Sequence, residues 1–278
     1  MGRTEVLSIG RRSVCVALGA LWPTLALARS AGDDYLLLIL CDAAGGREAE
    51  FDIGWSTYLR QLARLSEVTR VEDFRRAAIR LRGGAQPLPA FLGVVSVHTA
   101  DFAAWVQALG QQERGGALAM GPAVDPASVR LLGYRETGVW SHPAPEPGDQ
   151  YLQLVFAEAS PGRSAEYTAW FREHHGPELT QVPGVVQVTA AVRVSTASAS
   201  GGGAAAPTYL SAMRFETPDI LRFKDTLESA AKTTVSPSSA YDLAHAWRET
   251  YARRGAPIDG VSNGQAPDGA SATPAPDR

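Results

Sequence analysis

Apolar positions recur every three to four residues at the start of residues 167–184 (YTAWFREHHGPELTQVPG), which predicts an amphipathic helix from Tyr167 to His175. One face of that helix carries three aromatic rings and an imidazole at i, i+3, i+4 and i+7: Tyr167, Trp170, Phe171 and His174. His175 borders this stripe. The glycine and proline at 176–177 are expected to end the helix, because glycine accepts the left-handed cap and proline cannot continue the hydrogen-bond ladder. The run VVQVTAAVRV that follows is rich in β-branched residues and predicts a strand.

This pattern of strands and helices occurs twice along the chain with a nearly constant offset. YLLLILCD from Tyr35 matches YLQLVFAE from Tyr151, and GREAEF from Gly46 matches GRSAEY from Gly162. EVTRV from Glu67 matches QVPGV from Gln181. FLGVVSVHT from Phe91 matches YLSAMRFET from Tyr209, and YRET from Tyr134 matches WRET from Trp247. Each half reads strand, helix, strand, strand, helix, strand, which is the ferredoxin-like order.

A single βαββαβ unit leaves one face of its sheet bare, and a second copy in the same chain can cover it. We therefore predict an α+β fold of tandem ferredoxin-like βαββαβ repeats packed as an intrachain pseudo-dimeric α/β barrel, with leucine and β-branched side chains between the sheets. Residues 71–83 (VEDFRRAAIRLRG) contain helix formers, but their counterpart is a strand, so we predict a strand there too. The arginines of this region are expected on a solvated strand face rather than in an anion site: Arg70, Arg75, Arg76, Arg80 and Arg82.

The duplication also sets the predicted domain boundaries. Repeat 1 spans residues 34–140, a proline-rich linker spans residues 141–150, and repeat 2 spans residues 151–254. Residues 255–278 have too few apolar side chains to offset the entropy of ordering, so this tail is predicted to be disordered.

Residues 1–30 form a segment of a different kind. Arg11 and Arg12 precede an apolar run that is shorter than a bilayer span and ends in the small-x-small pattern ALA at 26–28. We interpret the segment as a signal peptide of the twin-arginine type, with a Sec signal and an uncleaved membrane anchor as alternatives. The mature protein is then expected in the periplasm or outside the cell, or in the cytoplasm if this interpretation is wrong.

The composition excludes several classes of protein. With 278 residues, 45% of them apolar, and a formal net charge of -3, the chain is expected to be globular and has no basic footprint for nucleic acid. Cys15 and Cys41 stand far apart and no zinc-type spacing occurs, so no metal site is predicted. Cys41 follows an apolar run and is expected to be buried as a small hydrophobic side chain. The sequence contains no nucleophile elbow, phosphate loop or dinucleotide fingerprint.

The motif His175-Gly-Pro, followed by a leucine and by Pro-Gly at 183–184, comes directly after the aromatic helix. It resembles the EthD-like family of the dimeric α/β-barrel superfamily, which typically shows H-x-P, a leucine and P-G. The resemblance covers residues 151–255 and implies a barrel with a pocket in each half between sheet and helices. Relatives include small cyclases, oxygenases that act on aromatic compounds without cofactors, and proteins with no known reaction.

The first half resembles this family less closely. It keeps GREAEF and Trp55, but the position that matches the motif histidine is expected near Leu59 or Arg60. The Pro-Gly pair has become Thr69-Arg70. The first half therefore looks like a degenerate copy that has lost any such site.

Five residues of the second half are candidates for a site. His175 and His174 are the candidate catalytic residues, because an imidazole titrates near neutrality and can transfer protons. The alternative for His175 is a helix-terminal histidine that bonds free carbonyl groups. Tyr167, Trp170 and Tyr209 are candidate ligand-binding residues that could form an aromatic wall for a flat molecule, the alternative being an ordinary core stripe.

The leading hypothesis is an exported barrel protein that binds a small apolar or aromatic molecule in repeat 2 and transforms it with a histidine acid or base, as a cofactor-independent oxygenase, cyclase or lyase. No cofactor is predicted. One alternative is a haem-binding, peroxidase-like barrel, because chlorite-dismutase-like and dye-decolorising peroxidases share tandem barrels, although no histidine here has a proximal-ligand context. Another is a non-catalytic binding module. The predicted partner is the small ligand, with no nucleic acid, membrane contact only through an uncleaved signal, and homo-oligomerisation left open.

Overall fold

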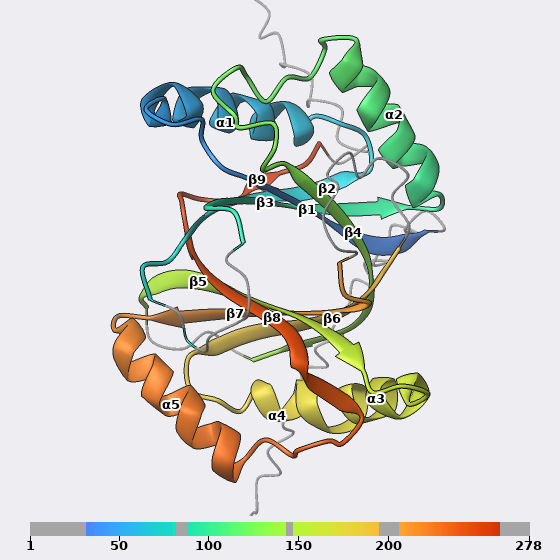
Figure 1. Ribbon diagram of the computed structural model, residues 1–278, viewed down its shortest axis with the longest axis vertical. Helices are drawn as coiled ribbons and strands as arrows, with labels where there is room; N and C mark the ends of the chain where they lie inside the picture. The colour runs from blue at the N-terminus through green and yellow to red at the C-terminus, as the bar shows by residue number, and fades with distance from the viewer. Residues whose placement is uncertain (1–31, 80, 82–87, 143–146, 195–205, 262–278) are drawn as a thin grey trace, which may run out of the picture. The chain divides into compact units, whose positions relative to one another are not determined.

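Each half of the chain forms a four-stranded antiparallel sheet with its helices on one face (Figure 1). The computed structural model describes residues 32–79, 81, 88–142, 147–194 and 206–261. The first half contains β1 (Asp33–Cys41), α1 (Glu48–Leu62), β2 (Val68–Arg76), β3 (Phe91–Thr99), α2 (Phe102–Arg114) and β4 (Arg130–Ser141). The second half contains β5 (Asp149–Ala159), α3 (Ser164–Trp170), η1 (Phe171–His175), α4 (Gly176–Leu179), β6 (Val185–Arg193), β7 (Tyr209–Thr217), α5 (Ile220–Thr233), β8 (Tyr241–Arg253) and β9 (Ile258–Asp259).

The two sheets close into one barrel. The strand orders are β4-β1-β3-β2 and β6-β7-β5-β8, and antiparallel pairing of β4 with β6 and of β8 with β2 joins both edges. β4 and β8, with 12 and 13 residues, are the longest strands because each pairs with strands of both halves. Figure 1 looks into this ring, with the helices of the two halves on opposite sides of it. The predicted α+β fold of tandem ferredoxin-like repeats packed as a pseudo-dimeric α/β barrel is confirmed.

Alternation along the strands separates the core under the helices from a core inside the barrel. In β1, Leu37 and Ile39 face the helices of the first half, whereas the residues between them face inward. The inward set includes leucines of both halves: Leu36, Leu38, Leu40, Leu92, Leu152, Leu154 and Leu210. Burial of a leucine side chain stabilises by about 1.5 to 3 kcal/mol. The bare sheet faces therefore cover one another with leucine side chains, as predicted.

Two tyrosines link the halves in a reciprocal way. The hydroxyl of Tyr134 in β4 donates to the carbonyl oxygen of Pro207 at 3.1 Å, and the hydroxyl of Tyr251 in β8 donates to the carbonyl oxygen of Pro89 at 3.0 Å. Each proline lies just before the third strand of the opposite half. Tyr134 therefore corresponds to Tyr251, and the predicted match of YRET with WRET at Trp247 is wrong by four residues. The short motif therefore recurs out of register.

A residue in the left-handed region precedes the second strand of each half. Glu67 has a φ of 73° and Gly184 a φ of 96°. The carbonyl oxygen of Glu67 accepts the backbone N–H of His98 at 2.8 Å, and that of Gly184 accepts the backbone N–H of Glu216 at 2.9 Å. Glu67 therefore corresponds to Gly184, and the predicted match with Gln181 is wrong by three residues.

The structure also tests the ambiguous segments. Residues 71–76 belong to β2, so the repeat predicted this strand better than local helix propensity did. β9 pairs with β2 and lies in the segment assigned to the disordered tail, so ordered structure extends to Asp259. Cys41 is buried, as expected. The predicted signal peptide, Arg80, Arg82 and residues 262–278 lie outside the described residues. Among the described residues, no helix is long and apolar enough to span a membrane.

Candidate functional site

The helix of the second half does not end at Gly176 and Pro177, contrary to the sequence prediction. It runs from α3 through η1 and α4 to Leu179, and Gly176 has a helical φ of -61°. η1 is a π-helix, in which hydrogen bonds join residues five apart. Pro177 lies in the first turn of α4, where its missing N–H does not break the ladder.

The π-helix inserts one residue, which decides which histidine faces the aromatic stripe. α3, η1 and α4 hold 7, 5 and 4 residues, one more than the 15 of α1. As a result His175 stacks on Trp170, with ring centroids 4.4 Å apart, and meets Phe171 edge-on at 5.1 Å. His174 is exposed. The expectation that His174 ends the stripe is wrong because it assumed 3.6 residues per turn throughout.

His175 occupies the place of Tyr58 in the first half, rather than that of Leu59 or Arg60 as predicted. The hydroxyl of Tyr58 donates to Oε1 of Glu113 at 2.6 Å. By contrast, Nδ1 of His175 is buried and has no hydrogen-bond partner among the described residues. Because α4 continues beyond it, His175 is not the helix-terminal cap that the alternative interpretation required.

Burial lowers the pKa of His175 from 6.5 to about 4, against a smaller opposing effect of the Glu178 carboxylate. The imidazole is therefore neutral at pH 7. The two carboxylate oxygens of Glu178 accept the backbone N–H of Ser236 at 2.7 Å and its hydroxyl at 2.6 Å. The indole N–H of Trp170 donates to the carbonyl oxygen of Ser236 at 3.1 Å. Ser236 thus fixes both the Trp170 ring, on which His175 stacks, and the Glu178 carboxylate, which acts on the pKa of His175.

An apolar pocket of about 200 Å³, which we call the aromatic pocket, lies between α3 and the strands β6 and β7. Its aromatic lining consists of Trp140, Tyr167, Phe171 and Tyr209. Its aliphatic lining consists of Ala190, Ala191, Val192 and Leu210. Exposed polar side chains form its rim, namely Thr137, Thr168 and Arg172. The pocket can therefore surround a flat apolar molecule and offer hydrogen bonds at one edge.

Two of the five predicted site residues line this pocket. Tyr167 and Tyr209 face it from α3 and β7, with ring centroids 4.4 Å apart. Trp170 and His175 do not line it, but both contact Phe171, which does. His174 is exposed and does not line the pocket. The structure thus brings the two tyrosines together and places the imidazole one ring behind the pocket wall.

Trp140, which sequence reasoning missed, is supplied by the last strand of the first half. Its ring lies 5.9 Å from Phe171. It also packs on Gly176, where a Cβ would come within 2.7 Å of the indole. Gly176 therefore makes room for Trp140 rather than capping a helix. No local signal in the sequence indicated Trp140, because Gly176 next to Pro177 has the pattern of a helix end.

The equivalent space in the first half is filled and closed by charged side chains. The indole N–H of Trp55 donates to Oδ1 of Asp73 at 2.9 Å. Nε of Arg254 lies 3.7 Å from Oδ2 of Asp73, and its Nη2 lies 2.9 Å from Oδ1 of Asp52. The guanidinium of Arg254 also covers the ring of Phe91 at 5.3 Å. We call Asp52, Trp55, Asp73 and Arg254 the charged lock.

The second half replaces each member of the charged lock by a smaller or uncharged residue. In the register set by the tyrosines and the left-handed turns, the replacements are Thr168 for Asp52, Phe171 for Trp55, Ala190 for Asp73 and Thr137 for Arg254. All four line the aromatic pocket. The pocket exists because these side chains leave the space that the lock fills in the first half.

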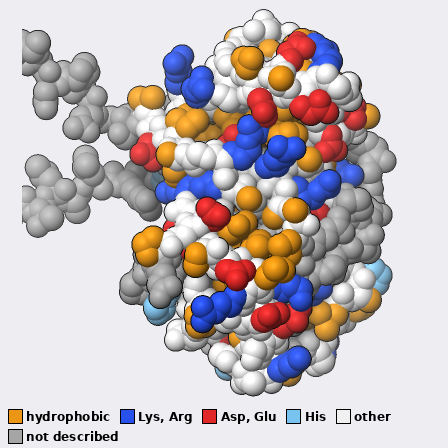
Figure 2. Space-filling view, turned by 90° about the vertical axis from the view of Figure 1, so that its left-hand side faces the viewer, with side chains coloured by type: hydrophobic (Ala, Val, Ile, Leu, Met, Phe, Trp, Pro, Cys, Tyr) orange, Lys and Arg blue, Asp and Glu red, His pale blue; other side chains and the backbone are white. Residues whose placement is uncertain are grey.

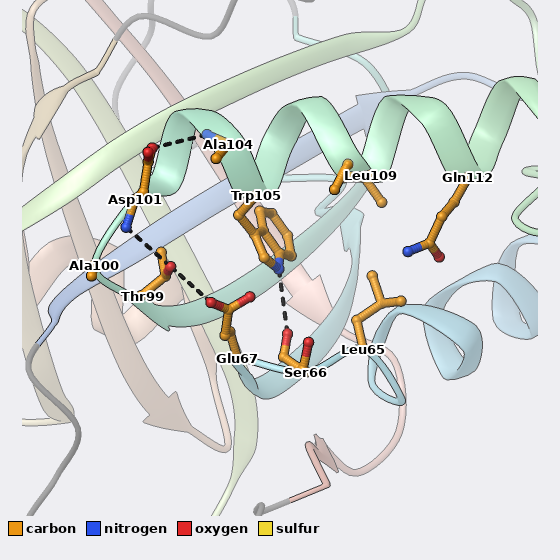
Figure 3. Close-up of a pocket in the computed structure, with 11 residues that line it drawn as sticks. Leu65, Ser66, Glu67, Thr99, Ala100, Asp101, Ala104, Trp105, Leu109 and Gln112 are labelled. Carbon is orange, nitrogen blue, oxygen red and sulfur yellow. Dashed lines mark hydrogen bonds between the residues drawn. The ribbon is translucent and has the colours of Figure 1, made fainter.

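A wider groove of about 380 Å³ lies on the first half, between α2 and the turn before β2 (Figure 3). Oε1 of Glu67 accepts the hydroxyl of Thr99 at 3.0 Å, and the indole N–H of Trp105 donates to the carbonyl oxygen of Ser66 at 3.3 Å. Oδ1 of Asp101 caps α2. Most residues that line the groove are exposed, and these polar contacts hold the local backbone. Although larger than the aromatic pocket, the groove is an open surface feature.

The aromatic pocket does not fit haem. Haem iron takes histidine, cysteine, methionine or tyrosine as a protein ligand. Of these types only Tyr167 and Tyr209 line the pocket, and burial raises the pKa of Tyr167, which opposes the phenolate that iron would need. Among the described residues, no three histidine, cysteine, aspartate or glutamate side chains are grouped as ligands for a metal ion.

No family model matches the chain, and a search of curated proteins finds no match. Membership of the EthD-like family therefore stays a prediction. Similar solved structures include an anthrone oxidase-like protein (10% identity, 82% of this chain and 94% of that chain, TM-score 0.49). Another is a proposed monooxygenase from Fusobacterium nucleatum (7% identity, 81% of this chain and 94% of that chain, TM-score 0.49). A third is a chlorite dismutase from Candidatus Nitrospira defluvii in complex with imidazole (11% identity, 80% of this chain and 92% of that chain, TM-score 0.49). These likenesses are too distant to carry an argument, and the fold rests on the strand order described above.

Proposed function

We propose that the second half of this barrel binds a small, flat, mainly apolar molecule in the aromatic pocket. The observation that supports it most directly is the contrast with the first half, in which the same space is closed by the charged lock. An ordinary core stripe would be filled in both halves, because protein interiors are close-packed. The second half instead keeps aromatic walls around a space of about 200 Å³.

The dimensions of the pocket define the class of ligand. A dry apolar cavity of about 150 Å³ holds benzene, so a pocket of about 200 Å³ suits a molecule with one aromatic ring and a short substituent. Thr137, Thr168 and Arg172 at the rim can bond a hydroxyl, carbonyl or carboxylate of that substituent. A phenol or another oxygenated one-ring compound combines both features.

A second candidate function is acid or base catalysis on the bound molecule by His175, in an oxygenase, cyclase or lyase that needs no cofactor, as the EthD-like resemblance suggests. It is favoured by the neutral imidazole whose buried Nδ1 has no partner among the described residues. Phe171 lies between the imidazole and the pocket, so this role requires the Phe171 ring to turn aside when the ligand enters. The binding function does not depend on that movement.

The test of binding uses phenol, indole and benzyl alcohol as probes, with binding followed by calorimetry and by ligand-detected NMR. The double variant Phe171→Trp/Ala190→Asp rebuilds the Trp55–Asp73 pair in the second half and should abolish binding. If this variant does not fold, Ala190→Leu serves the same purpose by filling the pocket. The matched control is Ala244→Leu, at an exposed position of β8. Unchanged probe affinity in the pocket-filling variants would contradict the proposed function.

The catalytic role is tested separately with His175→Asn and any probe that the protein converts. Loss of acid or base assistance is expected to lower turnover by about 10²- to 10⁴-fold, with little change in the dissociation constant, because His175 does not line the pocket. A variant that binds and turns over the probe like the parent would rule out His175 as the acid or base and leave the binding function in place.

A further inference from the structure

Inside the barrel, one buried carboxylate is surrounded by three guanidinium groups. Glu72 of β2 is 2% exposed. Its Oε2 accepts Nη2 of Arg214 at 2.5 Å, and its Oε1 accepts Nη2 of Arg253 at 2.9 Å and Nη2 of Arg70 at 3.3 Å. The neighbours of Arg214 along β7, Met213 and Phe215, face the helices, so by alternation these groups lie on the inner face of the sheet.

The single carboxylate does not saturate the donors around it. A guanidinium carries five N–H groups, so three guanidinium groups together offer more donors than one carboxylate can accept. Arg214 also donates to the amide oxygen of Gln187 at 3.4 Å, and Arg253 donates to that of Gln150. Nε of Arg70 and Nε of Arg253 are buried and have no hydrogen-bond partner among the described residues. Buried donors of a charged group are destabilising unless an acceptor reaches them.

These side chains line a pocket of about 180 Å³ in which positive charge exceeds negative charge. Three arginines face two carboxylates, Glu72 and Glu216, and Glu216 already accepts an N–H of Gln150. Burial lowers the pKa of Arg253, and the nearby Arg70 and Arg214 lower it further, against the raising effect of Glu72 and Glu216. The guanidiniums therefore repel one another, and an added anion would relieve that repulsion.

Charged side chains of both signs lie on the face of the barrel at which the strands of this pocket begin or end. β5 begins and β7 and β8 end on the left of Figure 1, and this is the side that faces the viewer in Figure 2. Lys and Arg side chains gather there at mid-height, with Asp and Glu side chains among them. The side chain of Arg70 is 43% exposed, in keeping with the predicted solvated face, but its Nε is buried and its Nη2 contacts Glu72.

We propose that this inner pocket is a binding site for a small oxyanion, either a carboxylate or a phosphate group, held by Arg70, Arg214 and Arg253. The planar fork of a guanidinium matches the paired oxygens of such anions and can bind them bidentately. Glu72 holds the three arginines through hydrogen bonds to its carboxylate, and the anion accepts hydrogen bonds from their remaining N–H groups. The site shares no lining residue with the aromatic pocket, so the two proposals stand or fall separately.

A purely structural role for the cluster makes a different prediction. Glu72 belongs to the first half and Arg214 and Arg253 to the second, so the cluster also bridges the halves of the barrel. If bridging were its whole role, oxyanions would affect the protein only through ionic strength. Specific binding instead requires an effect that saturates with the concentration of one anion at constant ionic strength.

The experiment measures the Tm of the full chain in increasing phosphate or acetate, with chloride exchanged to hold ionic strength constant. At a hundred times Kd the expected rise in Tm is about 5 to 10 °C for a chain of this size. A larger rise with phosphate assigns the site to phosphate groups, and a larger rise with acetate assigns it to carboxylates. The absence of a saturable rise with either anion would overturn the proposal.

Arg70→Gln is the diagnostic variant, because Arg70 is the most exposed of the three and its loss leaves Glu72 with two arginines. It should lose most of the anion-dependent rise in Tm. Arg135→Gln is the control, since Arg135 is exposed and pairs with Asp33 at 3.5 Å outside the pocket. It should respond like the parent. If Arg70→Gln does not fold, Arg70→Lys keeps the charge but not the fork, and a retained full response in it would equally contradict the proposal.

Discussion

The two halves of the barrel have the same strand order, yet they use the space under their first helix in different ways. In the first half the charged lock fills and closes it, with the indole of Trp55 inside and Asp52, Asp73 and Arg254 around it. In the second half Phe171 and its uncharged neighbours leave a pocket of about 200 Å³. A duplicated scaffold can thus keep one copy as a packed support while the other gives up contacts to form a binding site.

The comparison also shows what the π-helix of the second half changes. α1 packs without interruption over its sheet, and the place of His175 is taken by Tyr58, whose hydroxyl has a partner in Glu113. The extra residue in η1 instead turns a histidine onto the aromatic stripe and leaves Nδ1 without a partner among the described residues. Single π-turns of this kind are frequent at functional sites because they reorient side chains at a cost in stability.

The largest effect is expected when a variant disrupts the charged lock in the first half. Trp55→Ala should lower the free energy of unfolding by about 3 to 5 kcal/mol, since it removes a fully buried indole and leaves Asp73 without its donor. Phe171→Ala should cost less, about 2 to 3 kcal/mol, because the pocket side of that ring already lacks contacts. Urea unfolding of both variants measures the difference. Equal losses would mean that the pocket is filled in solution and the contrast between the halves is false.

The sequence predicted the fold because the evidence for it is distributed. Hydrophobic alternation, the repeated GR-x-AE segment and the ferredoxin-like order all indicated the same architecture, so errors of three and four residues in the match at Glu67 and Trp247 did not change it. The candidate site depended on single positions and was predicted only in part. Tyr167 and Tyr209 line the pocket, because strand and helix faces follow directly from periodicity, and their role in ligand binding stays a prediction.

The rest of the site depended on features without a local signal. Because η1 contains an inserted residue, His175 rather than His174 packs against the aromatic stripe, and a π-turn has no distinct sequence pattern. Trp140 and Thr137 reach the pocket because β4 crosses to pair with β6, a contact between the halves that periodicity within one half does not reveal. Once the register is known, however, the lock and its replacements can be read directly from the two aligned sequences.

The next effect concerns the pH dependence of stability. Because burial lowers the pKa of His175 from 6.5 to about 4, the unfolded chain binds a proton in this pH range that the folded chain does not. The stability linked to His175 is therefore fully present above about pH 6.5 and is lost as the pH falls toward 4. The expected loss is on the order of 2 to 3 kcal/mol, after allowance for the partial exposure of the ring.

The matched comparison is His175→Asn, which keeps a polar side chain but cannot titrate. The free energy of unfolding of parent and variant is measured by urea at pH 7 and pH 4, so that the common titration of carboxylates cancels. The parent should lose about 2 to 3 kcal/mol more than the variant over this range. Parallel pH profiles would show that the imidazole is solvated, and His175 would then resemble the exposed His174 rather than a group held for chemistry.

The smallest effect concerns the turn before β2 and β6, where the halves place different residues in the same left-handed backbone. Glu67 adopts a φ of 73°, which is strained for any residue but glycine. The hydrogen bond that its carboxylate accepts from the hydroxyl of Thr99 compensates for this strain. Glu67→Ala keeps the strain and loses the bond, whereas Glu67→Gly loses both. The glycine variant should therefore be more stable than the alanine variant by about 1 kcal/mol, measured by thermal unfolding. Gly184→Ala should destabilise by more than this difference, because its Cβ would also come within 3.0 Å of the Phe223 ring. If alanine and glycine at position 67 are equally stable, the left-handed turn is not strained in the first half, and the correspondence of Glu67 with Gly184 would reflect hydrogen bonding alone.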